Sequence, residues 1–180
     1  VSVDVASVEY ADAVRLCDEG ALEMIDPAIL LPAEDGTAAA DDFIDGAVTE
    51  CFLATDFYSM VLAFNETSYP EAKPATPADF FDLEAFPGKR TIRKGAKFNL
   101  ELALMADGVP AAEVYDVLST PEGVDRAFAK LDTIKADTVW WEAGAQPVQL
   151  LADGEVSMTT VYNGRAFDAM VAEKQPFEII

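Results

Sequence analysis

The chain has 180 residues, 51% of them hydrophobic, which suits one domain or two small lobes with a packed core and argues against a disordered chain. Its formal charge is −21, from 33 acidic against 12 basic residues, and this excludes nucleic acid as an expected partner, because binding phosphates needs clustered Lys and Arg. With no histidine and only two cysteines, the chain lacks the groups for Ser-His-Asp or Cys-His catalysis and for a zinc site, so we expect no catalytic residue, metal or cofactor.

The first third of the chain carries strand, helix and loop patterns in turn. A short apolar strand is predicted over residues 1–6, then a helix over 10–19 that Gly20 ends. A loop rich in Pro, Ala and Asp covers 27–42, and the apolar run over 51–65 predicts a buried strand that crosses between two lobes. Because the chain opens and closes on strand patterns, we expect sequence to be missing on both sides, including any export signal.

Strand and helix patterns alternate through the rest of the chain, which indicates an α/β architecture. Thr76 and Pro77 predict a helix start, with Thr as the N-cap and Pro at the first helical position. The clearest helix begins at Thr120 and Pro121, and its predicted buried stripe is Val124, Ala127, Phe128 and Leu131. Further strands are expected at 89–92, 139–141, 155–162 and 177–180, and further helices at 99–107, 111–118, 146–153 and 164–174.

The strand that ends at Tyr162 is followed by Asn163, Gly164 and a helix. An aromatic ring at a strand end offers a face for an alkyl chain or a cation, and a helix start offers amide donors, so this corner suits a small ligand. A plain strand-turn-helix corner would give the same pattern, and the sequence leaves both interpretations open.

Three of the few basic residues lie close together, at Arg93, Lys94 and Lys97, between a predicted strand and a predicted helix. An Arg fork beside a helix N-terminus could anchor a carboxylate. A solvated loop is the alternative, and the spacing of a phosphate-binding Walker loop is absent.

Two further turns sit where a ligand could bind. Side chains of Trp140 and Trp141 point to opposite faces of a strand, so one is expected in the core, and the turn Gly144-Ala145-Gln146 could offer backbone amides. Glu9 and Tyr10 follow the first predicted strand, where a carboxylate could hold an ammonium group, although an exposed acid is the ordinary alternative.

Cys17 and Cys51 are separated by 33 residues. A disulfide between them would stabilise the fold by roughly 3–4 kcal/mol in the chain-entropy model. Two buried free thiols in a cytosolic protein are the alternative, and the residues alone do not separate the two cases, because bond and compartment imply one another.

Several strings of the chain, in order, resemble those of periplasmic spermidine/putrescine-binding proteins and their relatives. The strings are CDEGALEMID, PADFFDLEAFPGKR, LMADGV, RAFAKLDTIK, QLLADGEVSM and VYNGRAF, and together they cover nearly the whole chain. The resemblance implies a type II periplasmic binding protein fold, α/β and two-lobed. Residues 1–62 would be part of the first lobe, with its N- and C-terminal pieces missing, and 63–180 the second lobe.

The resemblance also implies a function and a location. The protein would be the substrate-binding component of an ABC importer, a periplasmic protein and not an enzyme, which captures a polyamine, amino acid or carboxylate in an interlobe cleft and delivers it to the permease. A ligand-sensing effector domain of the same fold, acting through a signalling partner, is the alternative. Export favours the Cys17–Cys51 disulfide.

The chain departs from the family at one loop. Polyamine binders carry acids where this chain has Arg93 and Lys94, and these bases would repel an ammonium group. Glu9 on one wall and Arg93 on the other would suit a zwitterion, and a plain carboxylate ligand is also compatible. The candidate ligand-binding residues are Glu9, Tyr10, Ser59, Arg93, Lys94, Gly144, Ala145, Gln146, Tyr162 and Asn163.

Overall fold

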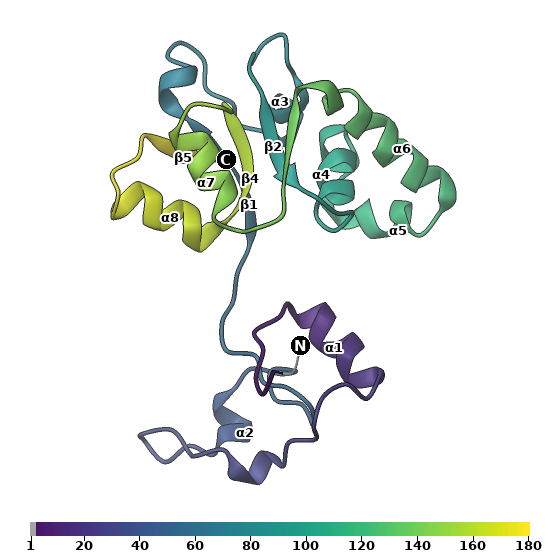
Figure 1. Ribbon diagram of the computed structural model, residues 1–180. Helices are drawn as coiled ribbons and strands as arrows, with labels where there is room; N and C mark the ends of the chain where they lie inside the picture. Colours follow the sequence, from purple (N-terminus) through teal and green to yellow (C-terminus); the bar gives the residue numbers. More distant parts are fainter. Residues whose placement is uncertain (1–2) are drawn as a thin grey trace. The chain divides into compact units, whose positions relative to one another are not determined.

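The computed structural model describes residues 3–180, which divide into two compact units between Phe57 and Tyr58 (Figure 1). We describe each unit by itself. The expected boundary lay after Leu62 instead. The strand that contains Leu62 hydrogen-bonds on both sides to strands of the second unit, and this places the division before it.

The first unit has helices but no extended sheet among its described residues. It contains α1 (Tyr10–Asp18), the short 3₁₀-helix η1 (Pro27–Ile29) and α2 (Ala39–Asp42), with one isolated bridge between Val48 and Leu53. The prediction of the first helix is therefore confirmed.

Two strand predictions in this region are wrong. Residues 3–6 form no strand, and Val1 and Ser2 of that prediction lie outside the described residues. Of the run over 51–65, only β1 (Met60–Asn65) is a strand, and Phe57 before it is 77% exposed. An apolar run becomes a strand only where a neighbouring strand continues its backbone hydrogen bonds along its length. Residues 51–59 have only separate bonds, such as that from the Ala54 N–H to the Ala47 carbonyl at 2.8 Å, and no continuous ladder.

The second unit is built on a five-stranded sheet in the order β3-β2-β4-β1-β5. Strands β2 (Arg90–Arg93), β3 (Thr138–Trp141) and β4 (Met158–Tyr162) run parallel, whereas β1 pairs antiparallel with β4 and with β5 (Phe177–Ile179). The register pairs Arg93 with Trp141 and Met60 with Tyr162. The ends of β2, β3 and β4 and the start of β1 therefore share one edge of the sheet.

Helices cover both faces of this sheet (Figure 1). Alternate residues of β1 enter two different hydrophobic clusters: Leu62 and Phe64 join the larger, and Ala63 the smaller. The larger cluster also takes side chains from α3 (Pro77–Phe81), α4 (Asn99–Ala106), α5 (Val114–Leu118) and α6 (Pro121–Asp132), and the smaller from α7 (Gln146–Ala152) and α8 (Asn163–Val171). The 3₁₀-helices η2 (Glu66–Ser68), η3 (Ala111–Glu113) and η4 (Lys135–Asp137) lie in the connections.

Most predicted elements of this unit are present, and the α/β class is confirmed. Helix α3 begins with the expected cap, in which the Thr76 hydroxyl accepts from the Asp79 N–H at 3.3 Å and the Asp79 carboxylate accepts from the Thr76 N–H at 2.9 Å. The strand expected over 155–162 is shorter, because β4 begins at Met158.

The buried stripe of α6 differs from the prediction at one position. Ala127 is fully buried, but Phe128 is 51% exposed. Gly123 is buried instead, and a Cβ there would lie 1.9 Å from the carbonyl oxygen of Val117 in α5. Phe128 follows Ala127 by one residue, about 100° around the helix, and so leaves the face that this close contact with α5 requires.

Candidate ligand-binding site

The residues proposed for the second unit gather at one edge of its sheet. Arg93, Trp141 and Tyr162 end the parallel strands β2, β3 and β4, and Ser59 directly precedes β1. In open α/β sheets, ligands bind outside the carboxyl ends of the strands. The alternation of parallel strands and helices thus brings together side chains that are far apart in the sequence.

Tyr162 lies at the centre of an aromatic group at this edge. Its ring meets the ring of Tyr58 edge-on, with centroids 5.3 Å apart, and that of Trp141 at 5.8 Å. Trp141 is 1% exposed and its Nε1 donates to the Thr160 carbonyl at 3.1 Å, whereas Trp140 is 43% exposed. The prediction that the two Trp side chains point to opposite faces is confirmed. The buried one, Trp141, packs against the ring of Tyr162.

The loop between β3 and α7 is held by the side chain of Gln146. Its Oε1 accepts from the N–H groups of both Glu142 and Ala143 at 2.8 Å. Gly144 lies against Tyr162, since a Cβ at Gly144 would be 3.2 Å from two atoms of that ring. Ala145 is exposed just before α7. The side-chain oxygen of Gln146, one of the candidate ligand-binding groups, therefore shapes its own loop.

The basic loop after β2 is joined to β3. The Lys94 N–H donates to the Trp141 carbonyl at 2.8 Å, and the Lys94 ammonium pairs with the Glu142 carboxylate at 2.8 Å. The hydrogen bond and charge of that pair raise the pKa of Lys94 and lower the pKa of Glu142, although both side chains are exposed and the pair adds little stability. The Arg93 guanidinium carbon lies 5.9 Å from the Trp141 ring centroid, so its positive charge lies beside the aromatic group.

Asn99 anchors this loop and is a residue that the sequence did not single out. It is 1% exposed, and its Nδ2 donates to the carbonyls of Arg93 at 2.6 Å and Gly95 at 2.8 Å. Phe98 before it has a φ of 71°, a left-handed conformation that is unfavourable for a bulky residue. The only sequence signal was an Asn at the first helical position, which is too common to indicate this role.

Two hydrogen bonds between Ser59 and Asn163 join the segment before β1 to the start of α8. The Ser59 N–H donates to Asn163 Oδ1 at 2.9 Å, and the Asn163 N–H donates to the Ser59 carbonyl at 2.9 Å. The Asn163 side chain is thus used to join the segment before β1 to the end of β4. These contacts fix Tyr58 and Tyr162, which neighbour the two residues, relative to each other.

Glu9 and Tyr10 lie in the first unit. The Glu9 carbonyl accepts from the N–H groups of Asp12 and Ala13, at 2.9 and 3.0 Å, at the start of α1. The ring of Tyr10, 53% exposed, meets Phe52 edge-on with centroids 5.3 Å apart. Their role in ligand binding stays a prediction.

The first unit contains the Cys17–Cys51 disulfide, whose Cα atoms are 5.8 Å apart. The expectation that the resemblance favoured is therefore confirmed. The bond joins α1 to the turn between Val48 and Leu53, the two residues of the isolated bridge.

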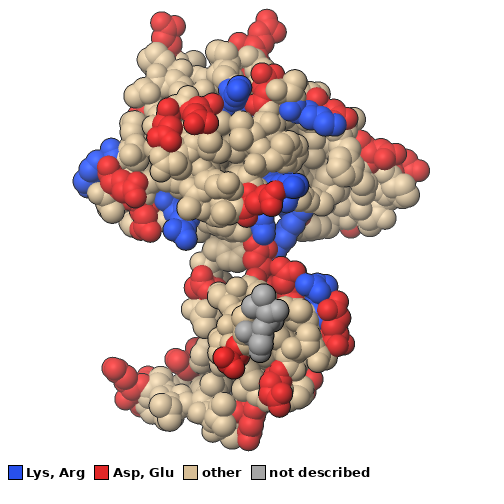
Figure 2. Space-filling view, viewed as in Figure 1, with Lys and Arg blue, Asp and Glu red and all other residues tan. Residues whose placement is uncertain are grey.

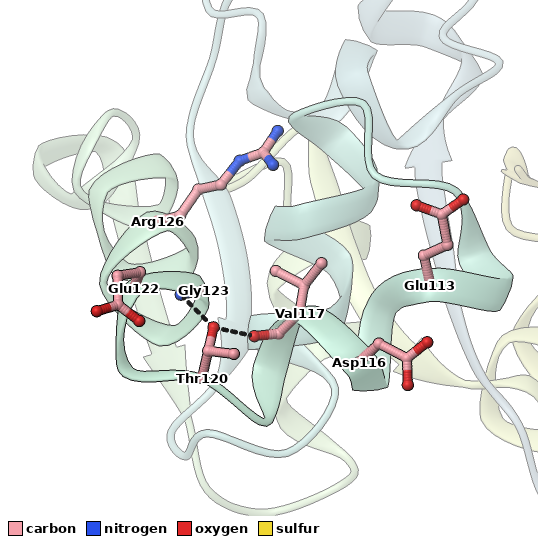
Figure 3. A pocket seen from close by; sticks show the side chains of 7 residues that line it. All are labelled: Glu113, Asp116, Val117, Thr120, Glu122, Gly123 and Arg126. Carbon is pink, nitrogen blue, oxygen red and sulfur yellow. Dashed lines mark hydrogen bonds between the residues drawn. The ribbon is translucent and has the colours of Figure 1, made fainter.

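One surface hollow lies away from this edge, between α5 and α6 (Figure 3). Its volume is about 550 Å³, and its lining residues are Glu113, Asp116, Val117, Thr120, Glu122, Gly123 and Arg126. Figure 3 shows Glu122 and Asp116 pointing in opposite directions. The Arg126 guanidinium forms an ion pair with the Asp107 carboxylate at 2.6 Å. The hollow therefore lacks converging polar groups. Within residues 3–180, no group of three or more Cys, Asp or Glu side chains could hold a metal ion.

The comparison with known families settles what kind of protein carries this edge. The model of the family described as "Bacterial extracellular solute-binding protein" matches residues 1–180. The chain belongs to this family. Its members are solute-binding proteins, and the family's description places them outside the cell membrane.

Similar proteins of this family include one curated relative and several solved structures. The γ-aminobutyric acid-binding protein of Pseudomonas aeruginosa is 52% identical over 165 residues, which are 92% of this chain and 45% of the relative. The PBP MotA from A. tumefaciens B6, solved in complex with glucopine, is 37% identical with a TM-score of 0.80, and 94% of this chain matches 50% of it. A GABA receptor is also 37% identical, with a TM-score of 0.70, and 93% of this chain matches 48% of it.

The chain thus spans about half the length of the relatives that it matches. A spermidine/putrescine substrate-binding protein from Streptococcus pneumoniae is 18% identical with a TM-score of 0.58, which shows a common fold alone. The resemblance to this broad family of solute-binding proteins is therefore confirmed, whereas nothing specific to polyamines is. No helix among residues 3–180 is long and apolar enough to cross a membrane.

Proposed function

We propose that the protein is the substrate-binding component of an ABC importer, outside the cytoplasmic membrane, and that its solute is a small amino acid with separated amine and carboxylate groups. The observation that carries the proposal is the edge where β2, β3 and β4 end, with the Tyr162 ring and the Arg93 guanidinium both beside Trp141. The disulfide supports a location outside the cytoplasm, because disulfides form and persist in oxidising compartments. The 52% identity to a γ-aminobutyric acid-binding protein supports the solute class.

The charges at this edge favour a ligand carboxylate over a polyamine. Arg93 and Lys94 follow each other at the end of β2, and Asn99 fixes the loop that carries them. The Lys94 charge is compensated by Glu142, but the Arg93 guanidinium would repel an ammonium group of spermidine at this edge and would attract a carboxylate. The aromatic rings of Tyr58 and Tyr162 offer apolar faces for the methylene chain between the ligand's two ends.

The proposal is tested by thermal shift and titration calorimetry on the full-length protein, with γ-aminobutyrate, other ω-amino acids, succinate, putrescine and spermidine. A ligand at about 100 times its dissociation constant stabilises the folded protein by about 2.7 kcal/mol, so a specific solute raises the melting temperature by several degrees. We expect the amino acids to do so and the polyamines not to. Stabilisation by polyamines alone would refute the proposed solute class.

The Arg93→Met variant tests the proposed role of Arg93. Loss of a charged hydrogen-bond partner should weaken binding of a carboxylate ligand about tenfold or more. Lys89→Met is the matched control, because Lys89 is an exposed base that precedes the same strand at its other end. Equal affinity in the two variants would show that Arg93 does not bind the solute.

A further inference from the structure

Gly144 lies unusually close to the ring of Tyr162. A Cβ at this position would lie 3.2 Å from both Cδ2 and Cε2 of Tyr162, which is shorter than an ordinary van der Waals contact, so the ring would have to shift by a few tenths of an ångström. The φ of Gly144 is not in the left-handed region, so the backbone itself would accept alanine. Glycine therefore allows the close approach of the Tyr162 ring and is not needed for the shape of the turn.

The geometry points to Gly144 as a positioning residue that sets where the Tyr162 ring stands and, through the ring, how long a solute the site accepts. We infer that a side chain at Gly144 would push the Tyr162 ring away from the loop that carries Gly144, and that the site would then favour shorter ligands. This inference rests on the proposed function, because Tyr162 limits ligand length only if the solute lies against it. It assigns to Gly144 a role that does not depend on its own contact with the ligand.

The surroundings decide which partner yields when a methyl group is added. The loop that carries Gly144 is held by the two hydrogen bonds to Gln146 Oε1. Trp141, whose ring meets the Tyr162 ring edge-on, is 1% exposed and donates through Nε1 to the Thr160 carbonyl. Tyr58 is 42% exposed and meets the ring only edge-on. In Gly144→Ala the Tyr162 ring, and not the loop or Trp141, is therefore the part expected to shift, by a few tenths of an ångström.

The chain supplies a matched control in Gly164, two residues after Tyr162. A Cβ at Gly164 meets nothing within 4 Å, and Gly164 also lacks a left-handed φ. Gly164→Ala thus adds the same methyl group near the same edge without touching the ring. Any difference in ligand affinity between the two alanine variants can therefore be assigned to the contact with Tyr162.

The test measures affinities of the full-length protein for β-alanine, γ-aminobutyrate and δ-aminovalerate by calorimetry. In Gly144→Ala, the affinity for the longest ligand relative to the shortest should fall about tenfold, the effect of one methylene in a closely fitted pocket, and Gly164→Ala should keep the ratio of the original protein. In a Tyr162→Ala background, Gly144→Ala should leave the ratio unchanged, because the ring through which it acts is gone. An unchanged ratio in the first variant overturns the inference.

A second measurement needs no ligand. The ring-proton resonances of Tyr162, followed by NMR in protein with labelled tyrosine, should shift in Gly144→Ala and not in Gly164→Ala, and unshifted resonances in both overturn the inference. If the original protein binds none of the three amino acids, the proposed function fails by itself. If it binds them but Gly144→Ala does not change the ratio, only the role of Gly144 fails.

Discussion

Arg90 is a fully buried cation whose bonds go to backbone carbonyls. It is 0% exposed, and its guanidinium donates to the carbonyls of Phe80 at 2.8 Å, Phe86 at 2.6 Å, Gly88 at 2.6 Å and Asp82 at 3.2 Å. Burial lowers the pKa of Arg90, and the four carbonyl dipoles take the place of water around its charge. The string PADFFDLEAFPGKR is part of the family resemblance, and its final residue, Arg90, has a structural role. The Arg90 side chain joins β2 to α3 and to the loop that follows α3.

Removing this guanidinium should cost much of the stability of the second unit. Arg90→Met leaves the carbonyls of Phe80 and Phe86 buried without donors, and we expect a loss of about 3 kcal/mol or more in the free energy of unfolding, measured by urea denaturation. Arg90→Lys should also destabilise, because an ammonium group cannot reproduce the planar fork. The control Lys89→Met, at an exposed neighbour, should stay within about 0.5 kcal/mol of the original protein. A loss below about 1 kcal/mol in Arg90→Met would contradict this structural role.

At this scale the sequence predicted which strand ends carry candidate residues but not how they touch. Tyr162, Arg93 and Gly144 could be placed at the carboxyl ends of strands from alternation alone. The roles of Asn99 and Tyr58 could not, because they depend on contacts with Gly95 and Tyr162 across turns and across the sheet. Such contacts leave no local pattern in the chain.

The elements whose signals are local were predicted well. The capping residues Thr76 and Thr120 each accept a hydrogen bond from the first turn of their helix, at α3 and α6. The elements whose formation depends on distant partners were not, as residues 3–6 and 51–59 show, because an apolar run is a strand only if another strand lies beside it. The exposure of Phe128 has a similar origin, since the packing of α5 selects the face of α6 that is buried.

The cap of α3 predicts a pH dependence of stability. Partial burial acts to raise the pKa of Asp79, but hydrogen bonds from the N–H of Ala75 and from Thr76 outweigh it and hold the pKa below its ordinary value. A carboxylate whose pKa is lower in the folded state stabilises the fold fully above about pH 5, and this contribution is lost as the pH falls through the folded pKa.

Asp79→Asn should therefore be less stable than the original protein by about 0.5 kcal/mol at pH 7, a modest value because solvent screens this partly exposed group. The difference should shrink as the pH falls below about 4 and through the lowered pKa of Asp79, until both side chains are neutral. Urea denaturation across this pH range measures it, with Asp125→Asn, at an exposed acid within α6, as the control for net charge. A difference that is constant with pH would show that the charge of Asp79 is irrelevant to the cap.

At the scale of the whole molecule, the acidic charge is spread over both units. Figure 2 shows acidic side chains on both units on the face drawn, with several basic side chains among them on the second unit and few on the first. With 33 acids against 12 bases, the general field attracts cations and repels anions, so the carboxylate ligand that we propose would depend on a local base such as Arg93. The net charge and the chemistry of the edge thus point in opposite directions, and only the local arrangement is specific enough to select a solute.

The two units also differ in the interactions that stabilise them. Both hydrophobic clusters are formed entirely by residues after Phe57. The hydrophobic residues that are buried among the described part of the first unit are small: Ala13, Ala39, Ala47 and Cys51. A cross-link between Cys17 and Cys51 therefore contributes a large share of the stability of this unit, roughly 3–4 kcal/mol in the chain-entropy model.

Replacing both cysteines should loosen the first unit and leave the second intact. In Cys17→Ala/Cys51→Ala, we expect the amide groups of α1 to exchange hydrogen at least tenfold faster, because the unfolded state is no longer constrained, while the amides of β1, β2 and β4 keep their protection. Hydrogen exchange resolved by residue measures both in one sample, so the strands are an internal control. Unchanged protection in α1 would mean that local packing suffices without the bond. Lost protection in the strands as well would mean that the two units unfold as one, and that the cross-link stabilises the sheet that carries Tyr162 as much as the helix that carries Cys17.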